Sequence, residues 1–64
     1  MFIELTENSQ KRSKLSINLN HLQSFEGNKH GTVLTMYGYG LPVLESYEQV
    51  KKLIENEVAA ERGY

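Results

Sequence analysis

Apolar residues recur at helical spacing in the C-terminal part of the chain, and this is its clearest pattern. Residues 46–61 read SYEQVKKLIENEVAAE, with most lysines and glutamates on the side opposite the apolar residues. The apolar stripe consists of Tyr47, Val50, Leu53, Ile54 and Val58. A stripe of this period is typical of an amphipathic α-helix, so one helix is predicted over residues 46–61.

Both ends of this helix carry recognisable signals. Ser46 can cap the first turn with its hydroxyl, and the Gln49 side chain can reach back to the Ser46 N–H. Glu48 adds negative charge where the helix dipole favours it, and Gly63 is a natural stop. The stripe is expected to pack on an apolar surface formed by residues 1–45. The alternative is that it binds a partner chain.

Before the helix, apolar and polar residues alternate, which is typical of strands with one buried face. Residues 7–14 are polar and predict a loop. Leu22 and Phe25 are spaced for a turn of helix or a bulge around residues 20–23. The expected strands span residues 2–6, 15–19, a short segment through Phe25, 32–37 and 41–45.

Two glycine-containing segments predict turns between the later strands. Residues 27–31 read GNKHG and residues 38–40 read GYG. Residues 32–37 carry apolar bulk on both faces, which favours a central strand. Pro42 cannot donate to a ladder, so its strand is expected at an edge.

Together these elements predict an α+β fold in a single domain over residues 1–64. It would be a small, curved antiparallel sheet of about five short strands, which could curl toward a barrel, with one C-terminal helix packed on it. The predicted core is Ile3, Leu5, Leu15, Ile17, Leu22, Phe25, Leu34, Met36, Val43, Val50, Leu53, Ile54 and Val58.

Size and composition narrow the possible functions. A chain of 64 residues without cysteine has no disulfide or thiolate metal site to support a marginal core. The N-terminus does not resemble a signal peptide, and no stretch is long and apolar enough to span a membrane, so the cytoplasm is expected. The formal net charge of −1 is unlike that of a general nucleic-acid binder, which is normally basic.

The order of these features resembles the small flagellar and swarming-motility proteins of the FlbD type. The similarity covers most of residues 3–54 and lies mainly at core and turn positions. It implies a non-enzymatic protein of a bacterial cell or prophage with a regulatory or assembly role, and it carries over no catalytic residues. The matching residues are Ile3, Leu5, Thr6, Ile17, Asn18, Leu22, Phe25, Glu26, Thr32, Leu34, Met36, Gly38, Val43, Glu45, Ser46, Val50 and Ile54.

Candidate chemistry is sparse, and no catalytic, cofactor or metal site is predicted. His21 and His30 lack the spacing of a zinc site and are expected in solvent. The GYG segment lacks the context of a phosphate loop. The remaining carboxylates before the helix are expected on solvent faces, because no spacing pairs two of them with a nucleophile; they are Glu4, Glu7, Glu26 and Glu45.

Two surfaces remain as binding candidates. Apolar side chains outside the predicted core favour a protein interface, used by a second copy in a homodimer or by another protein; they are Phe2, Val33, Tyr37, Tyr39 and Leu44. Basic residues in two loops form the alternative, a nucleic-acid contact in which Tyr37 and Tyr39 would stack bases. They are Lys11, Arg12, Lys14 and Lys29, with His30 beside Lys29.

Overall fold

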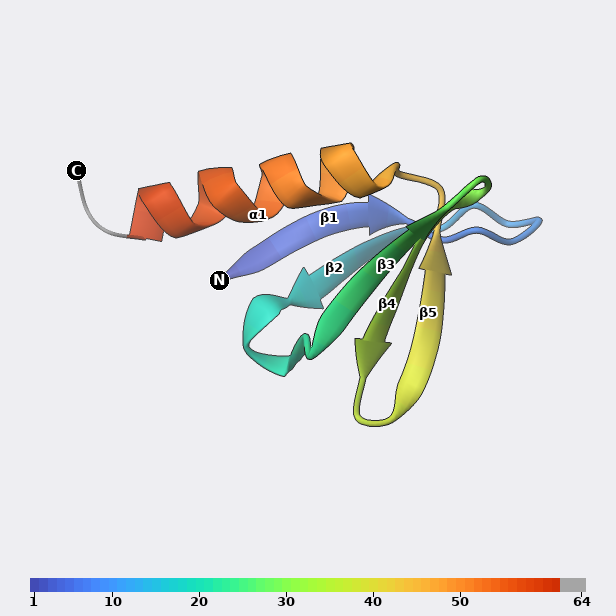
Figure 1. Ribbon diagram of the computed structural model, residues 1–64, viewed down its shortest axis with the longest axis horizontal. Helices are drawn as coiled ribbons and strands as arrows, with labels where there is room; N and C mark the ends of the chain where they lie inside the picture. The colour runs from blue at the N-terminus through green and yellow to red at the C-terminus, as the bar shows by residue number, and fades with distance from the viewer. Residues whose placement is uncertain (62–64) are drawn as a thin grey trace.

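A computed structural model describes residues 1–61 and contains five strands and one long helix (Figure 1). The predicted helix stop at Gly63 lies outside these described residues. The elements in chain order are β1 (Phe2–Thr6), β2 (Lys14–Asn18), a 3₁₀ turn η1 (Leu19–His21), β3 (Ser24–Asn28), β4 (Gly31–Met36), β5 (Tyr39–Val43) and α1 (Tyr47–Glu61).

The strands form two antiparallel sheets, one of order β1-β2 and one of order β3-β4-β5. The predicted α+β class is therefore confirmed, with β4 as the central strand of its sheet. The register sets Leu5 opposite Leu15 in the first sheet and Leu34 between Phe25 and Leu41 in the second. Facing residues share a side of the sheet, so these pairings collect the apolar side chains on the inner faces.

The two sheets meet at one corner and do not close into a barrel. Glu7 forms an isolated bridge with Val43, flanked by backbone hydrogen bonds from Leu44 N to Thr6 O at 2.9 Å and from Asn8 N to Pro42 O at 3.0 Å. Beyond this corner β1 and β5 diverge, and β2 is joined to β3 through η1 without a ladder. The barrel-like option is therefore wrong, because only the ends of β1 and β5 pair.

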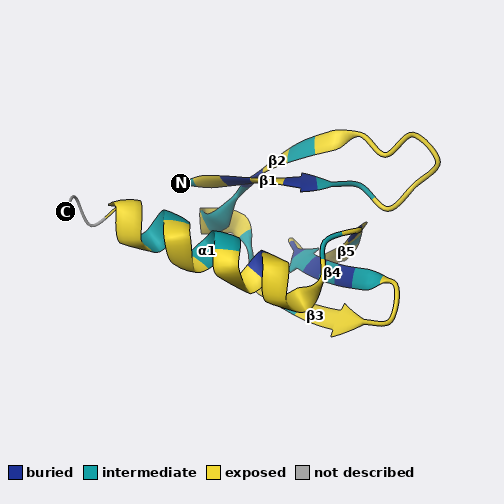
Figure 2. Cartoon of the chain, turned by 90° about the horizontal axis from the view of Figure 1, so that it is seen from above, coloured by how far each residue is buried: buried dark blue, intermediate teal, exposed yellow. Residues whose placement is uncertain are grey.

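Helix α1 lies across the opening between the two sheets, in contact with β1, β3 and β4 (Figure 2). Its first turn carries the predicted capping box. Ser46 N donates to Gln49 Oε1 at 2.8 Å, and Gln49 N donates to Ser46 Oγ at 3.2 Å. The Tyr47 ring stacks on Phe25 with centroids 5.1 Å apart, which fixes the start of the helix against β3.

The apolar stripe of α1 faces the protein's own core, as the sequence predicts. Val50 is completely buried, and Leu53 and Ile54 pack partly buried against the same cluster. Val58 lies outside the cluster, because the end of the helix extends beyond the start of β1 (Figure 1). The buried cluster comprises Ile3, Leu5, Ile17, Leu34, Met36, Val43 and Val50.

Several element boundaries differ from the sequence prediction. The second strand ends at Asn18, because the Asn18 side chain accepts from Asn20 N at 3.0 Å and starts η1. The last strand begins at Tyr39 rather than residue 41, so the turn is Tyr37–Gly38. Pro42 is at a sheet edge as predicted, with its carbonyl bonded to Asn8 N.

Candidate protein-interaction surface

The turn between β4 and β5 displays two tyrosines on the surface. Met36 pairs with Tyr39, so Tyr37 and Gly38 form a two-residue hairpin turn. Both turn residues have positive φ, 53° at Tyr37 and 81° at Gly38, which matches a type I′ turn. The side chains of Tyr37 and Tyr39 are 66% and 54% exposed. This hairpin therefore exposes two aromatic side chains to solvent at a short, well-defined turn.

The segment that follows β2 braces this hairpin from the side. The His21 ring lies 5.0 Å from the Tyr37 ring, tilted by 51°. Gln23 N donates to Thr35 O at 2.9 Å, and the Gln23 side chain accepts from Gly38 N at 3.4 Å. We call His21, Tyr37 and Tyr39 the aromatic tip. Sequence reasoning placed His21 among solvated residues, and no local spacing links it to Tyr37.

The aromatic tip is free of formal charge. The two segments that build it read LNHLQ over residues 19–23 and MYGYG over residues 36–40, without Lys, Arg, Asp or Glu. Recognition there would depend on ring contacts and hydrogen bonds from the tyrosine hydroxyls and the imidazole. Such contacts respond weakly to salt, unlike ion pairs with phosphates.

The other predicted interface residues do not join the tip. Phe2 begins β1 and pairs with Asn18 in the first sheet. Val33 is half-buried on the outer side of β4, opposite Pro42. Leu44 follows β5 at the corner, where its N–H bonds to Thr6. The five residues are therefore spread over several surfaces, and the structure gathers only Tyr37 and Tyr39.

Three of the predicted basic residues lie in two loops at the same end of the molecule, and Lys14 begins β2 (Figure 1). Lys11 and Arg12 belong to the β1–β2 loop, and Lys29 belongs to the β3–β4 turn. Figure 2 shows that these loops project on separate arms. Tyr37 and Tyr39 lie at the opposite end of β4, roughly 20 Å of strand away. The expected combination of basic rim and stacking tyrosines is not formed.

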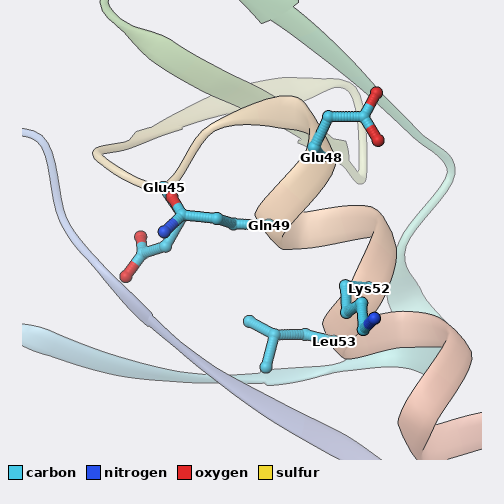
Figure 3. A pocket seen from close by; sticks show the side chains of 5 residues that line it. All are labelled: Glu45, Glu48, Gln49, Lys52 and Leu53. Atoms are coloured by element: carbon cyan, nitrogen blue, oxygen red, sulfur yellow. The ribbon is translucent and has the colours of Figure 1, made fainter.

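A groove of about 410 Å³ opens along the first turns of α1 (Figure 3). Its lining residues are Glu45, Glu48, Gln49, Lys52 and Leu53. The Glu45 carboxylate beside it is already engaged, accepting from Thr6 N and from Thr6 Oγ1, both at 2.9 Å. The expectation that Glu45 stands free on a solvent face is therefore wrong, because β1 ends against it.

Glu45 connects three elements at the corner of the fold. Its backbone carbonyl accepts from the hydroxyl of buried Thr32 at 2.8 Å, which adds β4 to the contact with β1. Burial alone would raise the pKa of the Glu45 carboxyl, but the hydrogen bonds from Thr6 and the nearby charge of Lys14 outweigh it. The net pKa is therefore below its ordinary value.

We expect Glu45→Gln to lower the melting temperature at neutral pH, at a cost of about 1 kcal/mol, since the group is partly solvated. A lowered folded-state pKa stabilises the fold above the unfolded value, about 4.3, and this stabilisation disappears as pH falls through the folded pKa. The difference in melting temperature between the parent and Glu45→Gln should therefore become smaller below about pH 4.3. Thermal melts over an acid series check this. Glu55→Gln, on an exposed helix position, is the control and should show no such narrowing.

Comparison of the chain with known protein families, curated proteins and solved structures found no match. The resemblance to FlbD-type proteins therefore stays a prediction from the sequence pattern. Within residues 1–61, no group of three or more His or Glu side chains is arranged to hold a metal ion. The same residues contain no helix with the length and hydropathy needed to cross a membrane.

Proposed function

We propose that this chain is a non-enzymatic protein-interaction module that binds a partner protein through the aromatic tip, in a regulatory or assembly role. The observation that carries the proposal is the backbone of Tyr37, which has a φ of 53° while its side chain is 66% exposed. A left-handed backbone costs a residue with a Cβ about 1 kcal/mol, and asparagine, aspartate or glycine would suit this turn better.

The strain at Tyr37 does not serve the core, because its side chain is mostly exposed and its ring packs, among the aromatic rings of residues 1–61, only on that of His21. Local rules are broken most often where a side chain is needed for function. Tyrosine is also enriched at protein interfaces, where its rigid ring buries area and its hydroxyl finds a partner. The matching partner surface would be an apolar cleft edged by hydrogen-bond acceptors.

The carboxylate of Glu45, which lines the groove, also favours a role without catalysis. A general acid at neutral pH needs a raised pKa and a free position near a substrate. Glu45 has a lowered pKa, and Thr6 occupies its oxygens with two hydrogen bonds. It therefore acts as a structural link between β1 and the start of α1.

The decisive experiment compares the intact protein with Tyr37→Asn as bait in an extract of its native cell. Asparagine tolerates the left-handed turn, so the variant should melt at or above the parent temperature. We expect it to lose the proteins that the parent captures at both low and moderate salt. Glu55→Gln serves as a second bait that should retain them. Equal recovery by the parent and Tyr37→Asn would refute the role of the tip.

A second candidate, nucleic-acid binding, is favoured by one observation: the two basic loops share an end of the molecule (Figure 1). One contact argues against this candidate. Lys14 is directed toward Glu45, with Lys14 Nζ 3.4 Å from Thr6 Oγ1. Retention on heparin and a single-stranded DNA shift at two salt concentrations test this candidate. Binding that weakens steeply with salt and with Lys11→Glu would support it over the aromatic tip.

A further inference from the structure

We propose that β2 pairs with β2 of a second copy, antiparallel about Ser16, to form one continuous four-stranded sheet of order β1-β2-β2-β1. The inference concerns a different surface from the aromatic tip and does not depend on the proposed function. It rests on which strand edges are free, on the residues that self-pairing brings together, and on the apolar surface it would cover.

The backbone of β2 has an unused hydrogen-bonding edge. Leu19 N bonds to Met1 O at 2.9 Å, and Glu7 N bonds to Ser13 O at 2.8 Å, at the two ends of the β1-β2 ladder. Hydrogen-bonded pairs alternate along an antiparallel ladder, so residues 15 and 17 also bond to β1. The N–H and C=O groups of Lys14 and Ser16 and the N–H of Asn18 therefore point away from β1, and within the described residues no second strand pairs with this edge of β2.

The outer edges of β1 and β5 are covered at the corner of the fold, whereas the outer edge of β2 is not. Thr6 on the outer edge of β1 bonds to Leu44 and Glu45, and α1 lies along the rest of that strand (Figure 1). The outer edge of β5 is occupied at Pro42 by Asn8. Tyr47 packs over the face of β3 at Gly27, where a Cβ would lie 2.7 Å from the Tyr47 Cβ, and within the described residues no strand pairs with the outer edge of β3. The edges of β2 and β3 are therefore both open to an added strand, but twofold pairing of β3 about its middle residue would set Glu26 against Glu26, which favours β2.

Twofold pairing about Ser16 brings compatible residues together. It sets Ser16 opposite Ser16 and Lys14 opposite Asn18, so no like charges face each other across the new ladder. The same arrangement on β1 would set Glu4 against Glu4. On the inner face, half-buried Leu15 would lie beside Ile17 of the second copy. The pairing therefore covers apolar surface that one chain leaves accessible, through the commonest symmetry of homo-oligomers.

Single cysteines test the pairing directly, because the chain has no cysteine of its own. Facing residues in a hydrogen-bonded pair have Cα atoms about 5.5 Å apart, within the range of a disulfide. We expect Ser16→Cys to form a covalent dimer under mild oxidation at micromolar concentration. The control is Glu4→Cys, which faces Ser16 within one chain but would be about 14 Å from its counterpart in the dimer. Equal cross-linking of both variants, or none of either, overturns the proposal.

A proline variant tests the same pairing independently, by light scattering after size exclusion. Ser16→Pro removes an N–H that the single chain does not use, so the fold should persist while strand addition is blocked. We expect the parent and Ser16→Ala to have the mass of two chains, and Ser16→Pro that of one, with unchanged circular dichroism. A parent of one-chain mass throughout the micromolar range contradicts the inference. If Ser16→Pro fails to fold, the comparison of Ser16→Cys with Glu4→Cys still tests the pairing of β2 with β2.

Discussion

Replacing Gly31 by alanine is expected to remove a large fraction of the protein's free energy of unfolding. Gly31 starts β4 with a φ of 138°, which side chains with a Cβ rarely adopt. A Cβ there would lie 2.2 Å from the carbonyl oxygen of Val43, so the end of β5 would have to move. Backbone strain and overpacking together should cost about 3 kcal/mol or more. A domain of this size has a total stability of roughly 3–10 kcal/mol.

Gly38→Ala is the matched control for this prediction. Gly38 also has a positive φ, 81°, but nothing lies within 4 Å of the position its Cβ would take. Its substitution should cost about 1 kcal/mol from backbone strain alone. Circular dichroism and thermal melts compare the two variants. If both lose the same stability, the approach of β5 to Gly31 is not as close as the structure has it.

Local chemistry explains the features that could be predicted from the sequence. The capping box joins Ser46 and Gln49, and its spacing can be recognised without knowledge of the rest of the fold. The alternation of apolar and polar residues likewise predicts which side chains lie on the inner faces of β1 and β4, because the side-chain period of a strand is fixed. The burial of α1 could also be predicted, since residues 1–61 contain no other long helix that could cover the sheets.

Long-range contacts explain what could not be predicted. Glu45 and Thr6 are 39 positions apart, and no pattern in either segment indicates their hydrogen bonds. The position of the turn between β4 and β5 could not be predicted either, because Gly38 and Gly40 are both good turn residues. The register decides it by setting Leu41 opposite Leu34 on the inner face, which leaves Tyr37 in the turn. The aromatic tip thus depends on strand pairing that involves residues outside the turn.

The second large effect is expected for Leu34→Ala, in the centre of β4. Leu34 is completely buried and pairs with Phe25 on one side and Leu41 on the other. Truncating a buried leucine removes apolar contacts and leaves a cavity, at a cost of about 2–5 kcal/mol. Among the residues that the structure describes, the buried cluster includes seven apolar side chains, so the remaining core has little capacity to collapse into the gap.

Urea denaturation of Leu34→Ala and Leu44→Ala provides the comparison. Leu44 is the same residue type but 38% exposed beyond the end of β5, so its truncation should cost less than about 1 kcal/mol. The midpoint should fall sharply for Leu34→Ala while the slope stays near the parent value, because the area exposed on unfolding changes little. Similar midpoints for the two variants would mean that the side chain of Leu34 in β4 does not lie at the centre of the core. In that case the hairpin that presents Tyr37 and Tyr39 would lack the rigid support on which the proposed interaction depends.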